Sequence, residues 1–112
     1  MRDCTLCFLR DGERLLLGMK KRGFGVGKWN GFGGKVDEGE SIEEAAAREL
    51  EEEISVKTHP DSFRKAAEIT FIFPHKTEWN QLVHVYFVDE WTGEPSESEE
   101  MRPEWFHEKD LP

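Results

Sequence analysis

Apolar residues recur along the first part of the chain in the pattern of a β-hairpin. The segment from Cys4 to Leu9 alternates in polarity, which is typical of a strand that turns one face toward a core. A second apolar run, from Arg14 to Met19, follows the turn signal Asp11-Gly12. We therefore predict that these two runs form paired strands.

Two more alternating segments lie in the second half of the chain. Ala67 to Phe73 and Leu82 to Val88 predict strands, and a polar, proline-containing loop joins them. A last short strand is predicted at Glu104 to Phe106.

One helix pattern lies between these strand-rich regions. Ser41, followed three residues later by Glu44, is the signature of a capping box, and the residues after it are strong helix formers. An apolar stripe at helical spacing is formed by Ile42, Ala45, Ala46, Leu50 and Ile54. A helix between strands predicts an α+β fold, in which the helix packs on a mixed sheet.

Residues 20–35 connect the hairpin to this helix and contain six glycines among sixteen positions. This content is too high for a helix, and the pattern is too regular for a disordered linker. We expect an ordered loop with one short strand near Trp29 to Phe32.

Length and charge restrict the class of protein. The chain has 112 residues and a net charge of −9 at pH 7, which predicts a single domain over residues 1–112 that repels nucleic acid polymers. No apolar run approaches the roughly 20 residues that span a bilayer, and the N-terminus lacks a signal-peptide pattern. We expect a monomeric, cytoplasmic protein with no membrane partner.

The only two cysteines, Cys4 and Cys7, have a spacing that can bind a metal or carry redox chemistry. On a strand, however, an odd separation directs the two side chains to opposite faces. We interpret both as small hydrophobic residues.

The predicted helix carries an unusual group of carboxylates. Glu49, Glu52 and Glu53 have i, i+3 and i+4 spacing, so they share one face, and they lie toward the helix C-terminus, where the dipole disfavours anions. Hard divalent cations such as Mg²⁺ bind one or two carboxylates together with substrate phosphates and water. The alternative reading of such a group alone is a solvated acidic face.

The wider sequence favours the metal site. Gly34, Glu40 and the segment from Arg48 to Val56 match the spacing of the Nudix box, so the chain resembles the Nudix hydrolases. The one departure is Ser55, where the family has a glycine that ends the helix, and we expect a left-handed serine there that costs about 1 kcal/mol. The resemblance implies that Arg48 orients the carboxylates.

The resemblance extends beyond the box to the MutT-like oxidised-purine nucleoside triphosphatases, through the segment LLLGMKKRGFGVGKWNGFGGKVDEGES and the later EMRPEWF. It implies water attack on the phosphate chain of a nucleoside triphosphate such as 8-oxo-dGTP, which gives the monophosphate and pyrophosphate, with Mg²⁺ or alternatively Mn²⁺ as cofactor. The implied metal ligands are Gly33, Glu49, Glu52, Glu53 and Glu100. The implied substrate contacts are Thr5, Lys20, Phe24, Asn30, Gly33, Gly34, Phe71 and Phe73.

In such enzymes a segment containing Trp-Pro-Asp-Asp and a terminal helix follow the position of Leu111-Pro112. This chain is expected to lack both, either as a fragment or as a minimal form with an open base site. Two alternatives to the triphosphatase stay open: a Nudix pyrophosphatase acting on another nucleoside diphosphate derivative, and a non-catalytic nucleotide-binding module. The intact box glutamates favour an enzyme.

Overall fold

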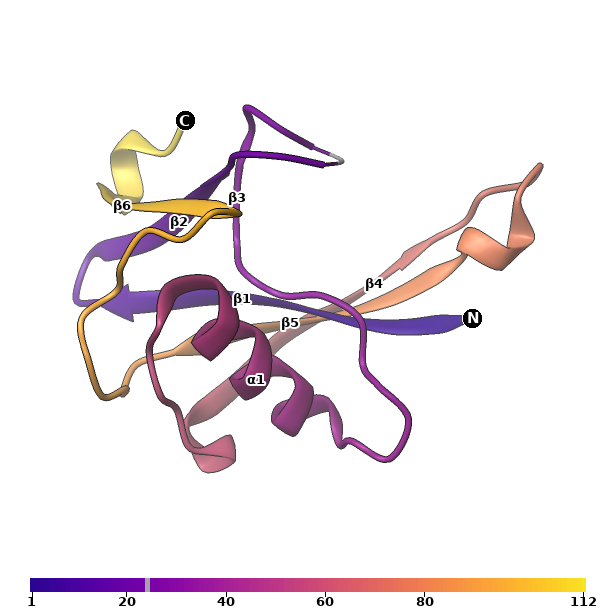
Figure 1. The fold of residues 1–112 in the computed structure, drawn as a ribbon, viewed down its shortest axis with the longest axis horizontal. Coiled ribbons are helices and arrows are strands. Elements are labelled where there is room, and N and C mark those ends of the chain that lie inside the picture. Colours follow the sequence, from indigo (N-terminus) through magenta and orange to yellow (C-terminus); the bar gives the residue numbers. More distant parts are fainter. Residues whose placement is uncertain (24) are drawn as a thin grey trace.

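The structure, a computed structural model, describes residues 1–23 and 25–112, and its strands form one mixed sheet with a helix on one face (Figure 1). The strands are β1 (Arg2–Asp11), β2 (Arg14–Lys20), β3 (Trp29–Asn30), β4 (Phe63–Phe71), β5 (Gln81–Val88) and β6 (Met101–His107). The helix is α1 (Ile42–Ile54), and three short 3₁₀ turns are η1 (Pro60–Ser62), η2 (Thr77–Trp79) and η3 (Glu108–Asp110). This arrangement confirms the predicted α+β class.

The two central strands of the sheet are parallel. The strand order is β3-β2-β1-β5-β4, with β6 paired to β2. β1 and β5 run parallel from the pair Arg2 and Gln81 to the pair Leu9 and Val88, whereas the other strand pairs are antiparallel.

One edge of β1 is shared between two neighbours. β2 pairs with β1 only up to Leu16 and then with β3 on the same side, while β6 pairs with β2 along the other side over its whole length. The glycine-rich loop enters the space that β2 leaves: Cys7 exchanges two backbone hydrogen bonds with Phe32, and the Thr5 N–H donates to the Gly34 carbonyl at 2.8 Å. Residues 32–36 are therefore fixed along β1, directly before the helix.

The main core lies between α1 and one face of the sheet. Cys7 and Leu9 of β1 pack there with Leu50 and Ile54 of the helix, and all four are fully buried. Cys4 belongs to a separate cluster with Val83 and Val85. The prediction that the two cysteines point to opposite faces is confirmed.

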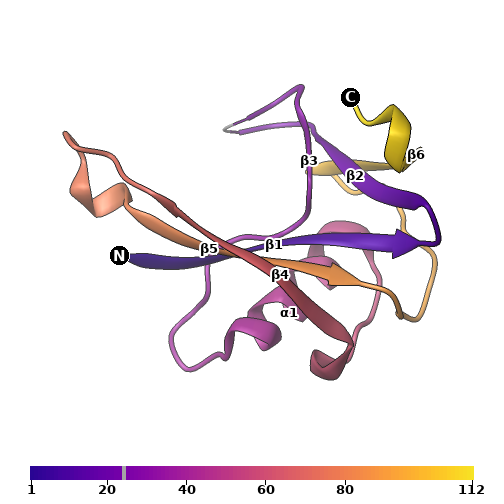
Figure 2. The same ribbon diagram turned by 180° about the vertical axis from the view of Figure 1, so that it is seen from behind.

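The opposite face of the sheet lies in front in Figure 2, with α1 behind it. From this sheet the end of β4 and the start of β5 extend as an arm that carries exposed apolar side chains. These are Ile69, Phe71, Ile72, Phe73 and Trp79.

The predicted bounds of β4 and β6 were wrong. β4 begins at Phe63 and ends at Phe71, so Phe73 lies outside the ladder. Its N–H donates to the side-chain oxygen of Asn80 at 2.7 Å, and the following Pro74 has no N–H to offer. β6 is longer than predicted, since it pairs with the whole of β2.

The ends of α1 follow the predicted pattern. Ser41 accepts a hydrogen bond from the Glu44 N–H at 3.0 Å, and the Glu44 carboxylate accepts one from the Ser41 N–H at 2.8 Å. At the other end Ser55 has a φ of 63° and donates its N–H to the Glu51 carbonyl. Within the described ranges, no helix has both the length and the apolar character needed to cross a membrane.

The left-handed Ser55 gives a stability prediction. Ser55→Gly should raise the free energy of unfolding by about 1 kcal/mol, because glycine adopts this conformation without the Cβ penalty. Urea unfolding of both proteins measures the difference. Ser96→Gly is the matched control, because Ser96 is also exposed but has no positive φ. An equal gain in both variants would show that the effect is not conformational.

Candidate active site

Arg48 forms hydrogen bonds and ion pairs with several acidic side chains of the site. Its guanidinium donates to both oxygens of Glu40, at 2.8 and 3.1 Å, and to Glu49 at 3.0 Å. Contacts to Glu52 and Asp37 are longer, at 3.4 Å. Such charge-assisted bonds hold the side chains in fixed directions, and they lower the pKa of Glu40 below its usual range.

Glu53 is buried, with 6% of its surface exposed, and it reaches from the helix to the glycine-rich loop. Its Oε1 accepts a hydrogen bond from the Gly33 N–H at 2.9 Å. Burial, and next the nearby charge of Glu49, raise the pKa of Glu53 to about 8. Burial and a neighbouring negative charge both make the ionised form of a carboxylate less stable than it is in water.

Gly33 and Gly34 lie where there is no room for a side chain. A Cβ at Gly33 would lie 1.9 Å from the Thr5 carbonyl oxygen, and one at Gly34 would lie 2.6 Å from a Glu49 oxygen. The loop backbone therefore passes tightly between β1 and the carboxylates of α1.

Thr5 contributes to the same contact. Its hydroxyl lies 3.3 Å from the Gly34 nitrogen and 3.4 Å from the Gly34 oxygen. The Thr5 side chain, predicted to contact the substrate, thus lies against the loop that carries the site.

The donor set fits a hard divalent cation. Glu49 and Glu53 offer carboxylate oxygens beside the Gly33-Gly34 backbone, and burial also raises the pKa of Glu49. In the ranges that the structure covers, no group of three or more acidic, histidine or cysteine side chains is arranged to hold a metal ion. Mg²⁺ does not require one, because phosphate and water supply most of its ligands.

The other predicted ligands lie at the border of this site. Glu52 is more exposed than Glu49 and faces Arg48. Glu100 lies on the loop before β6, and its charge contributes to the raised pKa of both Glu49 and Glu53. Lys20, at the end of β2, has the opposite effect on the pKa of Glu53. Lys20 and Glu100 therefore have opposite electrostatic effects on Glu53.

The residues predicted to contact the base are spread over a wider area. Asn30 is exposed on β3, and its side-chain oxygen accepts the Gly31 N–H at 2.8 Å. Phe71 and Phe73 lie on the exposed arm, with 45% and 37% of their surfaces exposed. Phe24 lies outside the described residues.

Some partners in the site were missed by the sequence reasoning. Glu40 is a fixed position of the box motif, and its spacing from Arg48 was the signal that could have identified it as the main partner of the arginine. No sequence pattern indicated that Asp37 would pair with Arg48. Lys21 and Arg22, basic residues of the glycine-rich loop, pair with carboxylates of residues 97–100.

His84 is a buried residue outside this site. Its Nε2 lies 3.0 Å from Asp3, and its Nδ1 lies 3.0 Å from the Lys65 amine. These contacts tie β5 to β1 and β4, which is a structural role.

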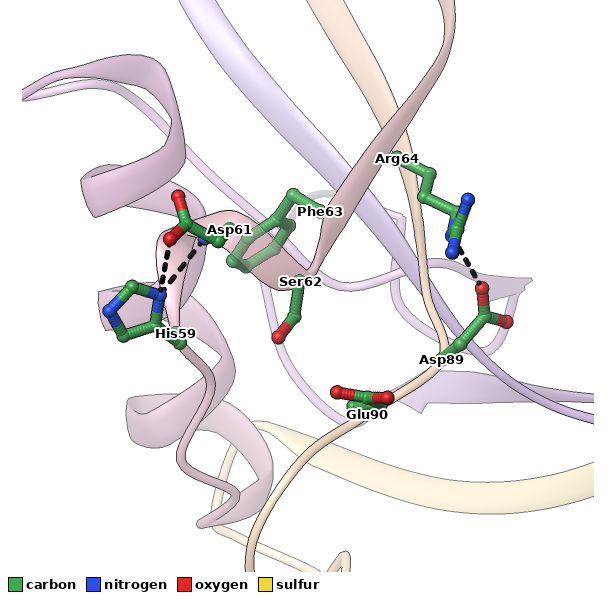
Figure 3. A pocket seen from close by; sticks show the side chains of 7 residues that line it. All are labelled: His59, Asp61, Ser62, Phe63, Arg64, Asp89 and Glu90. Carbon is green, nitrogen blue, oxygen red and sulfur yellow. Dashed lines mark hydrogen bonds and ion pairs between the residues drawn. The ribbon is translucent and has the colours of Figure 1, made fainter.

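A hollow of about 620 Å³ lies at another part of the molecule, between η1 and the end of β5. Figure 3 shows its polar lining, in which Arg64 points at Asp89 and His59 lies beside Asp61. None of the seven residues that line it is one of the predicted site residues. The candidate site is thus a surface of the helix and its loop and not this hollow.

Comparisons with known proteins agree with this geometry. The family model described as "NUDIX domain" matches residues 1–112. The chain is 52% identical to the oxidized purine nucleoside triphosphate hydrolase of Danio rerio and 50% identical to that of Mus musculus, over 96% of this chain and 67% of each relative. Among solved structures, a MutT NUDIX hydrolase from Burkholderia pseudomallei superposes with a TM-score of 0.85 at 29% identity, covering 99% of this chain and 86% of that one.

The burial of Glu53 predicts a pH-dependent stability in the absence of divalent cations. The folded state holds the Glu53 proton up to about pH 8, whereas the ordinary pKa is 4.5. Stability from this group is therefore full below pH 4.5 and is lost as the pH rises toward 8. Glu53→Gln keeps the neutral form, so with EDTA its melting temperature should exceed that of the wild type by roughly 5 °C or more at pH 8.5, and by little at pH 5.

Glu51→Gln is the control, because it removes the same charge from an exposed position of the same helix. A constant difference between Glu53→Gln and the wild type across this pH range would contradict the burial argument.

Proposed function

Because the chain belongs to the Nudix domain family, we propose that it hydrolyses oxidised purine nucleoside triphosphates such as 8-oxo-dGTP to the nucleoside monophosphate and pyrophosphate. The observation that carries this proposal is the pair of carboxylates, Glu49 and Glu53, held against the Gly33-Gly34 backbone. Two relatives named for this substrate class, at 50% and 52% identity, support it. The match over residues 1–112 supports a single domain.

The proposed cofactor is a divalent cation, Mg²⁺ or alternatively Mn²⁺. Its ligands would be Glu49, Glu52, Glu53, the Gly33 carbonyl and Glu100. When bound, the cation neutralises charge that develops on the phosphate chain. Carboxylate oxygens beside a backbone carbonyl are donors of the kind that Mg²⁺ combines with phosphate and water.

The protein's own residues would prepare the reaction. Arg48 fixes the direction of the carboxylates through bonds to Glu40 and Glu49. Lys20, at the end of β2, would contact the phosphate chain, and its positive charge lowers the pKa of Glu53. One glutamate of the box accepts the proton of the attacking water.

We assign base recognition to the sheet side of the site. Asn30 offers an exposed amide, and an amide can form paired hydrogen bonds with a purine edge. Phe71 and Phe73 offer exposed rings on which a base can stack. Thr5 would support this region through its contact with Gly34. The monomeric state and the cytoplasmic location stay predictions.

Pyrophosphate release from a panel of normal and oxidised purine triphosphates tests the activity directly. With Mg²⁺ present, we expect preferential hydrolysis of an oxidised purine. Glu53→Gln should lower turnover by at least about 100-fold, because general acid–base and metal-ligand roles are worth factors of this size or more. Glu51→Gln, on the exposed side of the helix, should retain wild-type turnover.

Circular dichroism of Glu53→Gln separates loss of chemistry from loss of fold. Full activity of this variant would remove Glu53 from the mechanism. A wild-type chain that binds nucleotide but releases no pyrophosphate would favour a binding module.

Asn30→Ala tests the base site. We expect the ratio of kcat/KM between oxidised and normal purines to change by roughly 10-fold or more, since one good base contact discriminates by 1–3 kcal/mol. Turnover on the best substrate should change less than this ratio. Equal losses on every nucleotide would count against a base-reading role.

A further inference from the structure

The strand β3 carries the proposed base contact, Asn30, and is very short. It pairs with β2 through two positions, with Gly18 opposite Asn30 and Met19 opposite Trp29. The side-chain oxygen of Asn30 accepts the Gly31 N–H at 2.8 Å, so the direction of the amide follows the local backbone. Two residues are fewer than a strand usually has, and side-chain contacts therefore matter for the position of β3.

The side chain of Trp29 ties β3 to β6. The Trp29 and Phe106 rings meet edge to face, with centroids 4.9 Å apart and planes at 78°. The guanidinium carbon of Arg102 lies 5.0 Å from the centroid of the Trp29 ring. Such aromatic and cation–π contacts are attractive and depend on direction. They connect the shortest strand to one that pairs with β2 along its whole length.

The strand register explains how these contacts form. Met19 of β2 lies opposite Trp29 on one side and opposite Arg102 on the other. Residues directly opposite in neighbouring strands share a face, so the Trp29 ring and the Arg102 side chain approach each other over Met19. Consecutive residues of a strand point to opposite faces. Trp29 therefore acts on Asn30 through the backbone and not by direct contact.

The chain is fixed separately on the other side of Asn30. Phe32 exchanges two backbone hydrogen bonds with Cys7, at 2.6 and 2.8 Å. A Cβ at Gly31 would lie 2.8 Å from the Cys7 carbonyl oxygen. Asn30 thus lies between two anchors, the Trp29 contacts with β6 before it and the backbone contacts with β1 after it. The first anchor consists of side chains, which substitution can remove.

We propose that Trp29, held by Phe106 and Arg102, is a positioning residue that directs the Asn30 amide toward the purine edge and so contributes to base selectivity. The inference rests on the proposed function, because it requires that Asn30 reads the base. An amide distinguishes purines through paired hydrogen bonds, and these bonds weaken steeply when they are misaligned. Movement of β3 therefore changes selectivity more than it changes the general affinity for nucleotides.

The ratio of the Kd values for an oxidised and a normal purine nucleoside monophosphate, measured by titration calorimetry, tests this role without hydrolysis. Trp29→Ala should reduce the preference for the oxidised purine roughly three- to tenfold, which corresponds to the strength of an aromatic pair. Trp29→Phe should keep most of the preference, because it retains a ring. Arg102→Gln, at an exposed position, should reduce it about two- to threefold. In an Asn30→Ala background, Trp29→Ala should change the ratio no further.

Arg14→Gln is the matched control for Arg102→Gln. The guanidinium carbon of Arg14 also lies 5.0 Å from a tryptophan ring, that of Trp105. The side chain of Arg14 is 50% exposed and that of Arg102 is 46% exposed, and each pairs with a carboxylate. Because Trp105 stacks on Trp91 and not on a residue of β3, Arg14→Gln should leave the ratio unchanged.

Three results would overturn the inference alone: equal weakening of both monophosphates in Trp29→Ala, equal effects of Arg14→Gln and Arg102→Gln, or a Trp29→Ala effect that persists without the Asn30 amide. Trp29→Phe and Arg102→Gln keep the test decisive if Trp29→Ala does not fold. A wild-type chain without preference, or an Asn30→Ala variant with the wild-type preference, would overturn base reading in the proposed function and the inference with it.

Discussion

The close passage of the glycine-rich loop between β1 and α1 is the constraint on which the site depends. Gly33 and Gly34 lie so near Thr5 and Glu49 that a side chain at either position would overlap them. The contact also satisfies polar groups that burial would otherwise leave unpaired, since the Gly33 N–H binds Glu53 and the Thr5 N–H binds the Gly34 carbonyl. Packing and hydrogen bonding therefore select one position of the loop, and the helix carboxylates take their places around it.

Electrostatics explains why this arrangement suits a cation better than a phosphate alone. The chain has a net charge of −9, and Arg48 is surrounded by the carboxylates of Glu40, Glu49 and Glu52. Lys21 and Arg22, two nearby positive charges, already pair with Glu97 and Glu100. Negative charge is thus left in excess around Arg48, and a polyanion would be repelled without a bridging ion.

Local signals in the sequence were sufficient for some elements and not for others. The capping box and the left-handed Ser55 were predicted because each depends on residues within one or two turns of the helix. The end of β4 was missed because the side chain of Asn80, directly before β5, accepts a hydrogen bond from the Phe73 N–H. The pairing of Lys21 with Glu97 could not be predicted, because the two residues lie 76 positions apart. The box motif predicted which carboxylates gather, but the burial of Glu53 depends on how the loop packs in three dimensions.

The parallel pairing of β1 with β5 also affects how the chain reaches this structure. β1 (Arg2–Asp11) is made well before its central partner β5, which begins at Gln81. Long-range pairing closes large loops before it gains contacts, so such topologies fold slowly. During synthesis the capped helix can form early, whereas β1 keeps an unpaired edge until β5 emerges. A chaperone that shields the first strand would therefore influence the yield of active protein more than one that acts on the finished chain.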